Sequence, residues 1–306
     1  MNKIHAKPLL LSDLKILIRG AGEMATGCAC RLYHSGFFRV LMTEIKRPLA
    51  VRRSVSLCEA VYEKSWTVED VRAELINCIE GTQEVWKKKA IPVLIDPTLS
   101  CRSALKPDIL IDAILAKKNL GTSMEAAHLV IALGPGFWAG KDAHYVVETA
   151  RGHQLGRLIA DGCSSPNTGI PGEISGHSVL RVVRAPVEGI FLSELSIGTP
   201  VIEGQTIGRV SNEQVKARLN GVLRGLIRHG TNVTQNLKIG DIDPRGDPSY
   251  CVTISEKARA IGGSVLEAIL RTYNSTFALS GKAKPSQHGS TAIQSRSNQI
   301  RQEGQF

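Results

Sequence analysis

The sequence has little of what marks a membrane-bound, secreted or zinc-ribbon protein. No apolar run approaches the roughly 20 residues that a transmembrane helix needs, and the leucines at residues 9–11 are too few for the core of a signal peptide. The seven cysteines, an odd number, are scattered without a CxxC pair, which indicates neither a disulfide framework nor a zinc ribbon. We therefore expect a cytoplasmic protein without membrane contact, and we assign no metal ligands.

Aromatic residues are also few, at 5 % of the chain, and the net charge of +10 is spread along the sequence. The only cationic run is at residues 87–89. A nucleic-acid-binding protein usually gathers its charge in a stripe and adds aromatic side chains that stack on bases. The composition favours phosphate-bearing small molecules or an acidic protein as partners, and it argues against nucleic acid.

The first half contains a regular alternation of short apolar segments and helical patterns. A helical pattern covers residues 23–35 and ends at Gly36, and a second begins at Thr67, where TVED has the spacing of a capping box. The alternation predicts an α/β fold with a parallel sheet and helices on its faces. Buried parallel strands are expected at residues 14–18, 40–42, 91–95, 109–111 and 129–133.

After about residue 140, short β-like segments and glycines replace the helical patterns, and an internal repeat appears. Residues 185–210 align without gaps on residues 217–242, at an offset of 32, with glycine turns at matching places. Such spacing predicts two intertwined β-halves. The repeat resembles the barrel-sandwich fold of biotinyl and lipoyl modules. Its central turn has no Met-Lys-Met signature, so we expect the fold without the swinging arm.

An amphipathic pattern predicts a last helix over residues 255–273 that packs on the body, and the polar tail after it is expected to be disordered. The chain thus divides into an N-terminal extension, a Rossmann-like nucleotide-binding domain, a β-rich connection, a barrel-sandwich-like repeat domain, a C-terminal helix region and a tail. Their expected bounds are residues 1–13, 14–142, 143–178, 179–245, 246–273 and 274–306.

A glycine turn between the first strand and the first helix is the clearest functional signal. Gly20-x-Gly22-x-x-Ala25 has the context that a dinucleotide-binding fingerprint requires. Gly20 permits the tight turn, Gly22 lets the backbone approach a pyrophosphate at the helix N-terminus, and Ala25 allows close packing of helix and sheet. Glu44 stands at the end of the next strand, 22 residues after Gly22, where an acidic residue meets ribose hydroxyls.

The charged residues around this turn leave the identity of the nucleotide open. Glu23 would oppose a pyrophosphate unless its side chain points away or meets Arg19. Arg52 and Arg53 follow the second strand and bring bidentate phosphate donors near the ribose end, although such arginines also occur as a solvated face. NADP and other phosphate-rich nucleotides both fit this pattern.

A second glycine turn, with Gly134 and Gly136 as candidate cofactor-binding residues, follows the strand at residues 129–133 and is expected at the ligand edge of the sheet. Three polar residues follow this turn: Asp142, His144 and Glu148. If their segment is a strand, their side chains lie on one face, where they could bind a metal, act as acid and base, or form an ordinary surface cluster. His153, Asn167 and Thr168 could line the same ligand edge of the sheet.

Recognisable catalytic groups are absent from the sequence, which has no Tyr-x-x-x-Lys pair, no serine nucleophile elbow and no P-loop. Cys28 and Cys30 fall in the first helix and are expected to pack in the core. Cys163 lies in a loop and is the better candidate for sulfur or selenium chemistry. We assign no catalytic residue.

Ordered phrases along the chain carry a further signal. They are RGAGEMATG, LMTEIKRPLAVRRSVSLCEAVYE, IPVLIDP, PDILIDAILAKKNLGT, IALGPGFWAGKDAHYVVETARGH, PNTGIPG and KIGDIDPR. Together they resemble the accessory family of selenium-dependent molybdenum hydroxylases (YqeB-type), over roughly residues 14–271. The resemblance implies a role in maturing hydroxylases that carry a labile selenium at a molybdopterin cofactor, with such a hydroxylase as partner.

Three interpretations follow from these observations. The first is an accessory protein that binds a molybdopterin dinucleotide, a pyrophosphate-linked nucleotide, with Gly20, Gly22 and Glu44 at the nucleotide and Arg52 or Arg53 at a further phosphate. The second is an NAD(P)-dependent oxidoreductase that uses the same turn. The third is a scaffold without a small ligand, whose β-repeat and basic tail dock the hydroxylase.

Overall fold

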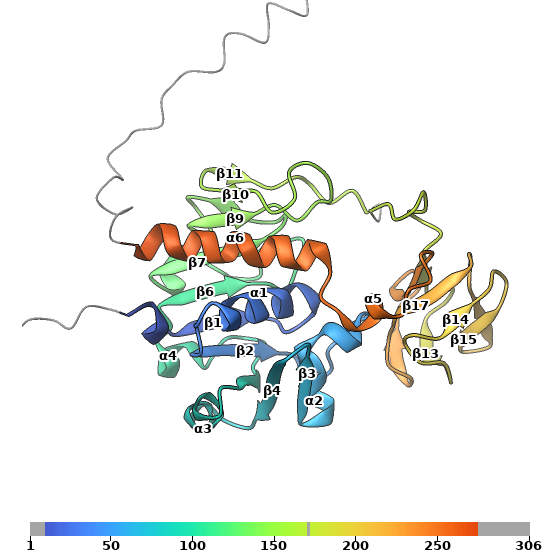
Figure 1. Ribbon diagram of the computed structural model, residues 1–306, viewed down its shortest axis with the longest axis horizontal. Helices are drawn as coiled ribbons and strands as arrows, with labels where there is room; N and C mark the ends of the chain where they lie inside the picture. Colours follow the sequence, from blue (N-terminus) through green and yellow to red (C-terminus); the bar gives the residue numbers. More distant parts are fainter. Residues whose placement is uncertain (1–9, 170–171, 275–306) are drawn as a thin grey trace, which may run out of the picture. The chain divides into compact units, whose positions relative to one another are not determined.

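The structure is a computed structural model that describes residues 10–169 and 172–274. The described residues up to Leu270 belong to one compact unit, and those from Arg271 belong to another. The main sheet of the first unit contains nine strands (Figure 1). They are β1 (Ile16–Arg19), β2 (Val40–Glu44), β3 (Ser65–Val68), β4 (Val71–Ile76), β5 (Ile91–Ile95), β6 (Ile109–Asp112), β7 (Leu129–Leu133), β9 (Tyr145–Val147) and β10 (Leu158–Ile159).

The strands follow the order β10-β9-β7-β6-β1-β2-β5-β4-β3, and neighbours are parallel except in the edge pairs β3–β4 and β9–β10. The order reverses at β1, which pairs with β2 on one side and with β6 on the other. At such a reversal the connections leave the carboxyl ends of the strands in opposite directions, and ligands of open α/β sheets bind in the crevice between them.

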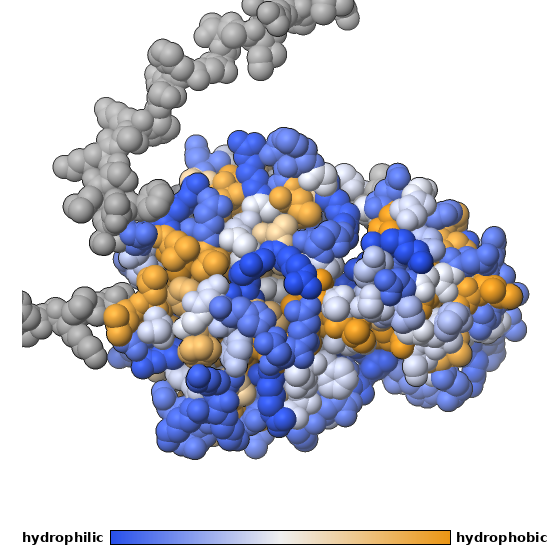
Figure 2. Space-filling view, viewed as in Figure 1, coloured by the Kyte–Doolittle hydropathy of each residue, from blue (hydrophilic) through white to orange (hydrophobic). Residues whose placement is uncertain are grey.

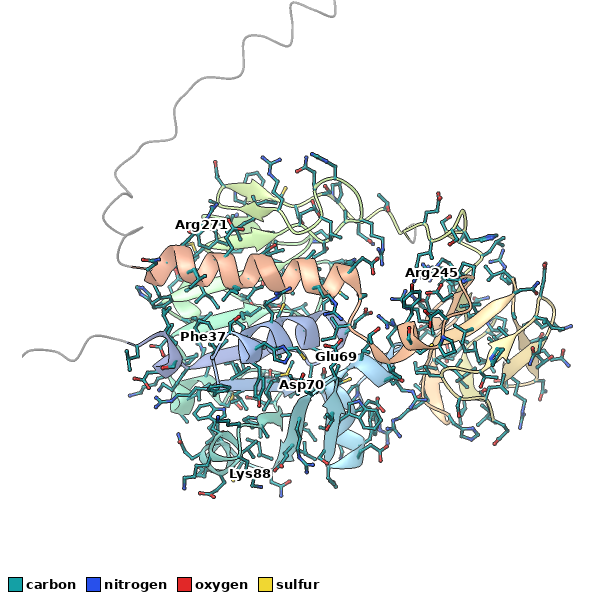
Figure 3. All side chains as sticks on the ribbon, in the orientation of Figure 1. Phe37, Glu69, Asp70, Lys88, Arg245 and Arg271 are labelled. Atoms are coloured by element: carbon teal, nitrogen blue, oxygen red, sulfur yellow. The ribbon has the colours of Figure 1, made fainter. Side chains whose placement is uncertain are left out.

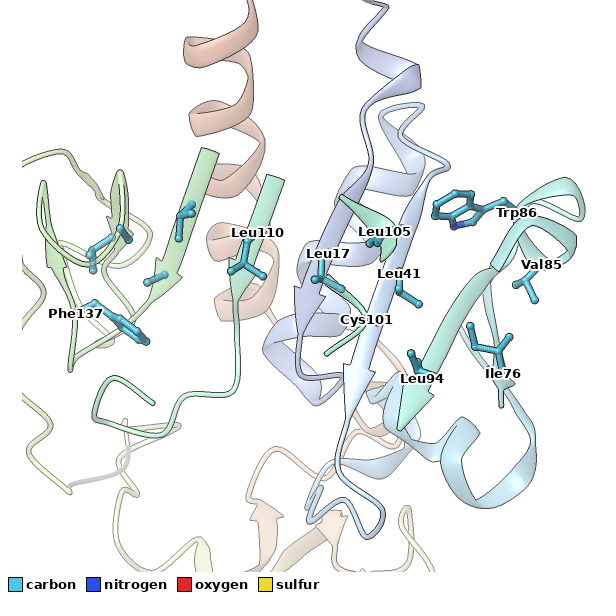
Figure 4. Close-up of a cluster of buried hydrophobic side chains, with 14 of the residues drawn as sticks. Leu17, Leu41, Ile76, Val85, Trp86, Leu94, Cys101, Leu105, Leu110 and Phe137 are labelled. Carbon is cyan, nitrogen blue, oxygen red and sulfur yellow. The ribbon is translucent and has the colours of Figure 1, made fainter. Parts of the chain in front are cut away.

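All five strands predicted in the first half are present, as β1, β2, β5, β6 and β7. β1, β6 and β7 are buried along their whole length, as expected of parallel strands covered on both faces. β9 and β10 extend the same sheet beyond residue 142. On one face, Leu17, Leu41 and Leu110 pack with Trp86 of α3 (Thr82–Lys87) and Leu105 of α4 (Arg102–Leu105) (Figure 4).

Two helices lie side by side on the other face, α1 (Glu23–His34) and α6 (Glu256–Tyr273) (Figure 1). Their backbones touch, because a Cβ added to Gly27 of α1 would lie 2.8 Å from the carbonyl oxygen of Ala258, and one added to Gly262 of α6 would lie 2.7 Å from that of Gly27. The predicted end of α1 is confirmed, since Gly36 follows it at φ +86°. The predicted last helix is confirmed as α6.

The prediction of a helix that begins at Thr67 is wrong. This segment forms the β3–β4 hairpin, in which Val68 pairs with Val71. β-branched and aromatic residues on both sides of the turn favour strands, and this preference overrides the spacing that suggested a capping box. The turn residue Glu69 adopts φ +54°. Its carboxylate accepts hydrogen bonds from the backbone of Ile254 (3.0 Å) and the side chain of Arg259 (2.9 Å), so that the hairpin fixes the start of α6 (Figure 3).

The repeat forms two four-stranded sheets whose pairing confirms the two intertwined halves. Val201 pairs with Gly221 and Gly189 pairs with Val233, so that the second strand of each half lies against the first strand of the other. The sheets have the orders β12-β19-β17-β14 and β16-β15-β13-β18. Their strands are β12 (Val182–Arg184), β13 (Gly189–Leu192), β14 (Pro200–Val201), β15 (Thr206–Val210), β16 (Glu213–Lys216), β17 (Gly221–Leu226), β18 (Thr231–Val233) and β19 (Lys238–Asp243).

The remaining elements are short. They are β8 (Trp138–Ala139), β11 (Gly162–Cys163), α2 (Ala60–Glu63), α5 (Ser249–Val252) and the 3₁₀ turns η1 (Leu11–Asp13), η2 (Arg53–Val55), η3 (Leu57–Glu59), η4 (Ile79–Gly81) and η5 (Met124–Ala126). Hydrophilic side chains cover much of the face in Figure 2, with apolar ones between them. Within the described part of the chain, no helix is both long and apolar enough to cross a membrane. The predicted tail, apart from Asn274, and residues 1–9 of the predicted extension lie outside the described residues.

Candidate functional site

A cavity of about 1000 Å³ lies at the carboxyl ends of β1, β2, β5 and β6, where the strand order reverses. This volume is at the upper end of the range usual for small-molecule sites. Of the residues proposed from the sequence, Gly20, Gly22, Glu44 and Arg52 line it. Asn167 and Thr168 line it as well, whereas His153 does not.

The two glycines of the first turn have different surroundings. Gly20 adopts φ +96°, and a Cβ added to it would lie 3.1 Å from the side chain of Ile114 and 3.3 Å from the carbonyl oxygen of Ala113. Gly22 is the N-cap of α1, and no atom lies within 4 Å of the position that its Cβ would take. Ala25 is fully buried inside α1 and does not line the cavity. The backbone at Gly22 is therefore open to a ligand.

Glu44 is tied to this turn by its carboxylate. Ala21 N–H donates to Oε2 (2.9 Å) and Ile45 N–H donates to Oε1 (2.8 Å). Burial raises the pKa of Glu44 above its ordinary value, although both backbone hydrogen bonds act in the opposite direction. Since a carboxylate offers about four lone-pair sites, each oxygen keeps an acceptor position for a ligand hydroxyl.

Glu23 is held by Arg52 rather than by Arg19. Its Oε1 accepts hydrogen bonds from Arg52 Nη1 (2.5 Å) and from the hydroxyl of Ser255 (2.7 Å), the residue before α6. Burial opposes ionisation of Glu23, but Arg52 and these hydrogen bonds hold its pKa below the ordinary value. Arg19 instead donates to Asp112 (3.1 Å), which ties β1 to β6. The carboxylate of Glu23 is thus neutralised by the protein.

The two arginines expected near the ribose end are both engaged by protein groups. Arg52 Nη2 donates to the carbonyl oxygens of Tyr250 (2.7 Å) and Thr253 (3.1 Å), in addition to the ion pair with Glu23. Arg53 Nε donates to Leu226 O (2.8 Å), and Arg53 does not line the cavity. These contacts link the segment after β2 to the β-repeat and to the segment before α6.

The second glycine turn serves packing. A Cβ on Gly134 would lie 2.5 Å from the hydroxyl of Thr149, and one on Gly136 would lie 2.6 Å from backbone atoms of Lys118. Neither glycine lines the cavity, although Pro135 between them does. The structure therefore brings the first turn, but not these glycines, to the site.

The residues Asp142, His144 and Glu148 have separate partners. Asp142 accepts from Trp138 N–H (2.8 Å) and His144 Nδ1 accepts from Val130 N–H (3.0 Å). Glu148 accepts from the backbone N–H groups of Ala150 (2.7 Å) and Ser165 (2.7 Å). Among the described residues, no group of three or more His, Cys, Asp or Glu side chains is arranged to hold a metal ion.

The thiols of Cys28 and Cys30 are buried in α1, as predicted, and burial raises the pKa of each to about 12. They are therefore unreactive at neutral pH. Cys163 is exposed, which leaves its suggested role in sulfur or selenium chemistry as a prediction.

Several cavity residues were missed from the sequence: Asp96, Lys117, Arg151, Ser255 and Lys257. Asp96 directly follows β5, and a polar residue at the carboxyl end of a predicted parallel strand is a signal that could have identified it. The others come from long connections and from the start of α6, where the sequence carries no comparable signal.

Asp96 supports the wall of the cavity, and its replacement by Asn gives a pH-dependent prediction. Its carboxylate accepts hydrogen bonds from the N–H groups of Ser100 (3.0 Å) and Cys101 (2.7 Å). Burial opposes ionisation, but these bonds lower the pKa to about 2. The stabilisation is therefore present above about pH 4 and is lost as the pH falls towards 2. We expect Asp96→Asn to lower the free energy of unfolding at pH 7 by about 1–2 kcal/mol.

Urea denaturation of both proteins between pH 7 and pH 3 measures this difference, which should shrink below about pH 4 as the Asp96 carboxyl of the unfolded wild-type protein becomes protonated. A difference that is the same at every pH in this interval contradicts the assigned hydrogen bonding.

No protein-family model matches the sequence. The chain is a homologue of the uncharacterized protein YqeB of Escherichia coli (strain K12), with 48% identity over 255 residues. The match covers 83% of this chain and 47% of YqeB. The chain thus spans about half the length of that relative.

The chain also has similarity to solved structures at low sequence identity. An aspartoacylase family protein from Mesorhizobium loti is 11% identical, with 75% of this chain and 84% of that chain covered and a TM-score of 0.26. The product-bound ectoine utilization protein EutE (DoeB) from Ruegeria pomeroyi is 12% identical, with 70% and 61% covered and a TM-score of 0.22. Scores this low carry no argument about the fold or function of this chain.

Proposed function

We propose that this chain binds a pyrophosphate-linked nucleotide at the Gly20–Gly22 turn and acts as an accessory protein in the maturation of a selenium-dependent molybdenum hydroxylase. The observation that carries the nucleotide site is the open N-terminus of α1 inside the cavity. Gly22, Glu23 and Met24 line the cavity, and the first N–H groups of a helix have no intrahelical acceptor. Together with the helix dipole, they favour a phosphate.

The strand order supports this assignment. β5-β2-β1-β6-β7-β9 is the order of a Rossmann-type doubly wound sheet, and the turn follows β1 at the reversal. Glu44, oriented by Ala21 and Ile45, is placed to accept hydrogen bonds from ribose hydroxyls. Arg52 and Arg53 are engaged by protein groups, so we do not assign them to the ligand.

The accessory role rests on the resemblance of the sequence to that family, and the hydroxylase is the proposed partner. Molybdopterin dinucleotide is the proposed ligand because it joins a pterin to a nucleotide through a pyrophosphate. We assign the repeat to a barrel-sandwich-like domain, which is supported by the crosswise pairing of its halves. An NAD(P)-dependent oxidoreductase that uses the same turn is the alternative. The described cavity lining contains no His, Tyr or Cys, so its proton donor would be a lysine or a carboxylic acid.

The experiment is mass spectrometry of the small molecules released from the gently purified protein, with molybdenum and selenium counted in the same sample. We expect a pterin dinucleotide. Release of NAD(P) without a pterin supports the oxidoreductase instead. That outcome is checked by adding the protein at micromolar concentration to NADH and measuring the change in NADH fluorescence. Absence of any nucleotide overturns the proposed site and favours the scaffold.

A further inference from the structure

Four cationic side chains from separate segments line the cavity. Lys117 follows β6, Arg151 follows β9, Lys238 begins β19 and Lys257 lies in the first turn of α6. They come from separate parts of the chain, yet all line one cavity, and Lys257 interacts electrostatically with the other three. Such a gathering of like charges requires a reason, because their repulsion opposes folding.

The protein compensates only part of this charge. Arg151 pairs with Glu256, and Lys238 lies 3.6 Å from Asp241. Among the described residues, neither Lys117 nor Lys257 has a hydrogen-bonding or ion-pairing acceptor, although Glu23 acts on Lys257 from a distance. Lys257 is half-buried and Lys117 is exposed. Partial burial and the neighbouring Arg151 and Lys117 lower the pKa of Lys257. An anion beside them relieves both costs.

The N-terminus of α6 adds to the same place. Ser255 accepts a hydrogen bond from Ala258 N–H (3.3 Å) and donates to Glu23 at the start of α1 (2.7 Å), so the two helix starts are joined. Both helix starts therefore face one cavity with their positive ends. The glycine turn and the two lysines without a paired acceptor thus line the same cavity.

We propose that Lys117, Arg151, Lys238 and Lys257 form a second anion subsite, which takes another anionic group of the same ligand whose pyrophosphate lies at Gly22. This inference rests on the proposed nucleotide site and deepens it. The ligand then spans the cavity from the Gly20–Gly22 turn to the start of α6, and the β-repeat contributes to its recognition through Lys238.

The test uses inorganic tripolyphosphate as a probe that carries no base. Its affinity is measured by calorimetry for the full-length protein, for Lys117→Gln/Lys257→Gln, and for the matched control Lys106→Gln/Lys141→Gln. The control removes two exposed lysines outside the cavity and changes the net charge equally. We expect the first double variant to bind about tenfold more weakly or worse, and the control to bind as the wild type does. Equal affinities for the two double variants overturn the subsite.

A second arm identifies the source of the anion. Tripolyphosphate is titrated into protein as purified and into protein stripped of its small molecules. Binding to the stripped protein alone supports a subsite that an anionic group of the ligand itself fills. Equal binding to both overturns the single-ligand assignment, because the subsite then takes a separate anion. Failure of the nucleotide site at Gly22 is recognised separately, by the absence of a released nucleotide.

Discussion

Replacement of Gly22 by Asp is expected to reduce nucleotide binding at least about 100-fold while leaving the fold intact. Gly22 is the N-cap of α1, with φ −71° and open space where a Cβ would stand. Asp is among the preferred N-cap residues, so the helix tolerates or gains from the change. Its carboxylate, however, would occupy the place proposed for the pyrophosphate and would repel it. Loss of two or more charge-assisted hydrogen bonds gives the stated magnitude.

The matched control is Gly22→Asn, which has nearly the same shape and N-cap preference but no charge. We expect Asn to weaken binding less than Asp does, and thermal unfolding of both variants to remain near that of the wild type. Binding is followed by the amount of nucleotide retained through purification. Full retention by the Asp variant contradicts the placement of the pyrophosphate at this turn.

Two adjacent glycines of α6 are expected to respond to alanine with opposite signs. A Cβ at Gly262 would lie 2.7 Å from the carbonyl oxygen of Gly27 and 3.1 Å from Cβ of Arg31, whereas no atom lies within 4 Å of one at Gly263. We expect Gly262→Ala to lower the free energy of unfolding by about 1–3 kcal/mol through overpacking. Gly263→Ala is expected to raise it by about 0.5–1 kcal/mol, because alanine is the better helix former.

Urea denaturation of the two variants beside the wild type measures these effects, and each variant serves as the control for the other. Because Gly262 sets how closely α6 approaches α1, its variant is also expected to displace Ser255 from Glu23 and to weaken nucleotide retention. Stabilisation by both substitutions contradicts the close approach of the two helices.

The buried core of this fold is predictable because its signal is local. Parallel strands covered on both faces need continuous apolar runs, and those runs identify β1, β2, β5, β6 and β7 in the sequence. The repeat is predictable for a similar reason, since glycine turns recur at a fixed spacing. The β3–β4 hairpin was missed because Thr67 and Asp70 satisfy a local helix-start pattern, and only pairing along β5 decides between strand and helix.

The candidate site is less predictable because it depends on contacts between distant parts of the chain. Gly22 and Glu44 belong to one βαβ unit and have a known spacing. The engagement of Arg52 by Glu23 and Tyr250 follows from tertiary packing over as many as 198 residues. Lys117 and Lys257 also come together through tertiary packing, and no pattern in the sequence indicates that they lie in one cavity.

The way in which α6 closes the cavity has a consequence for the order of synthesis. The ribosome delivers Gly22 early, but Ser255 and Lys257, which complete the wall beside it, follow more than 230 residues later. At cellular elongation rates this interval is on the order of tens of seconds. Until those residues emerge, the wall of the cavity beside Gly22 is incomplete. We therefore expect the proposed ligand to be taken up only after α6 has been synthesised and has packed on α1.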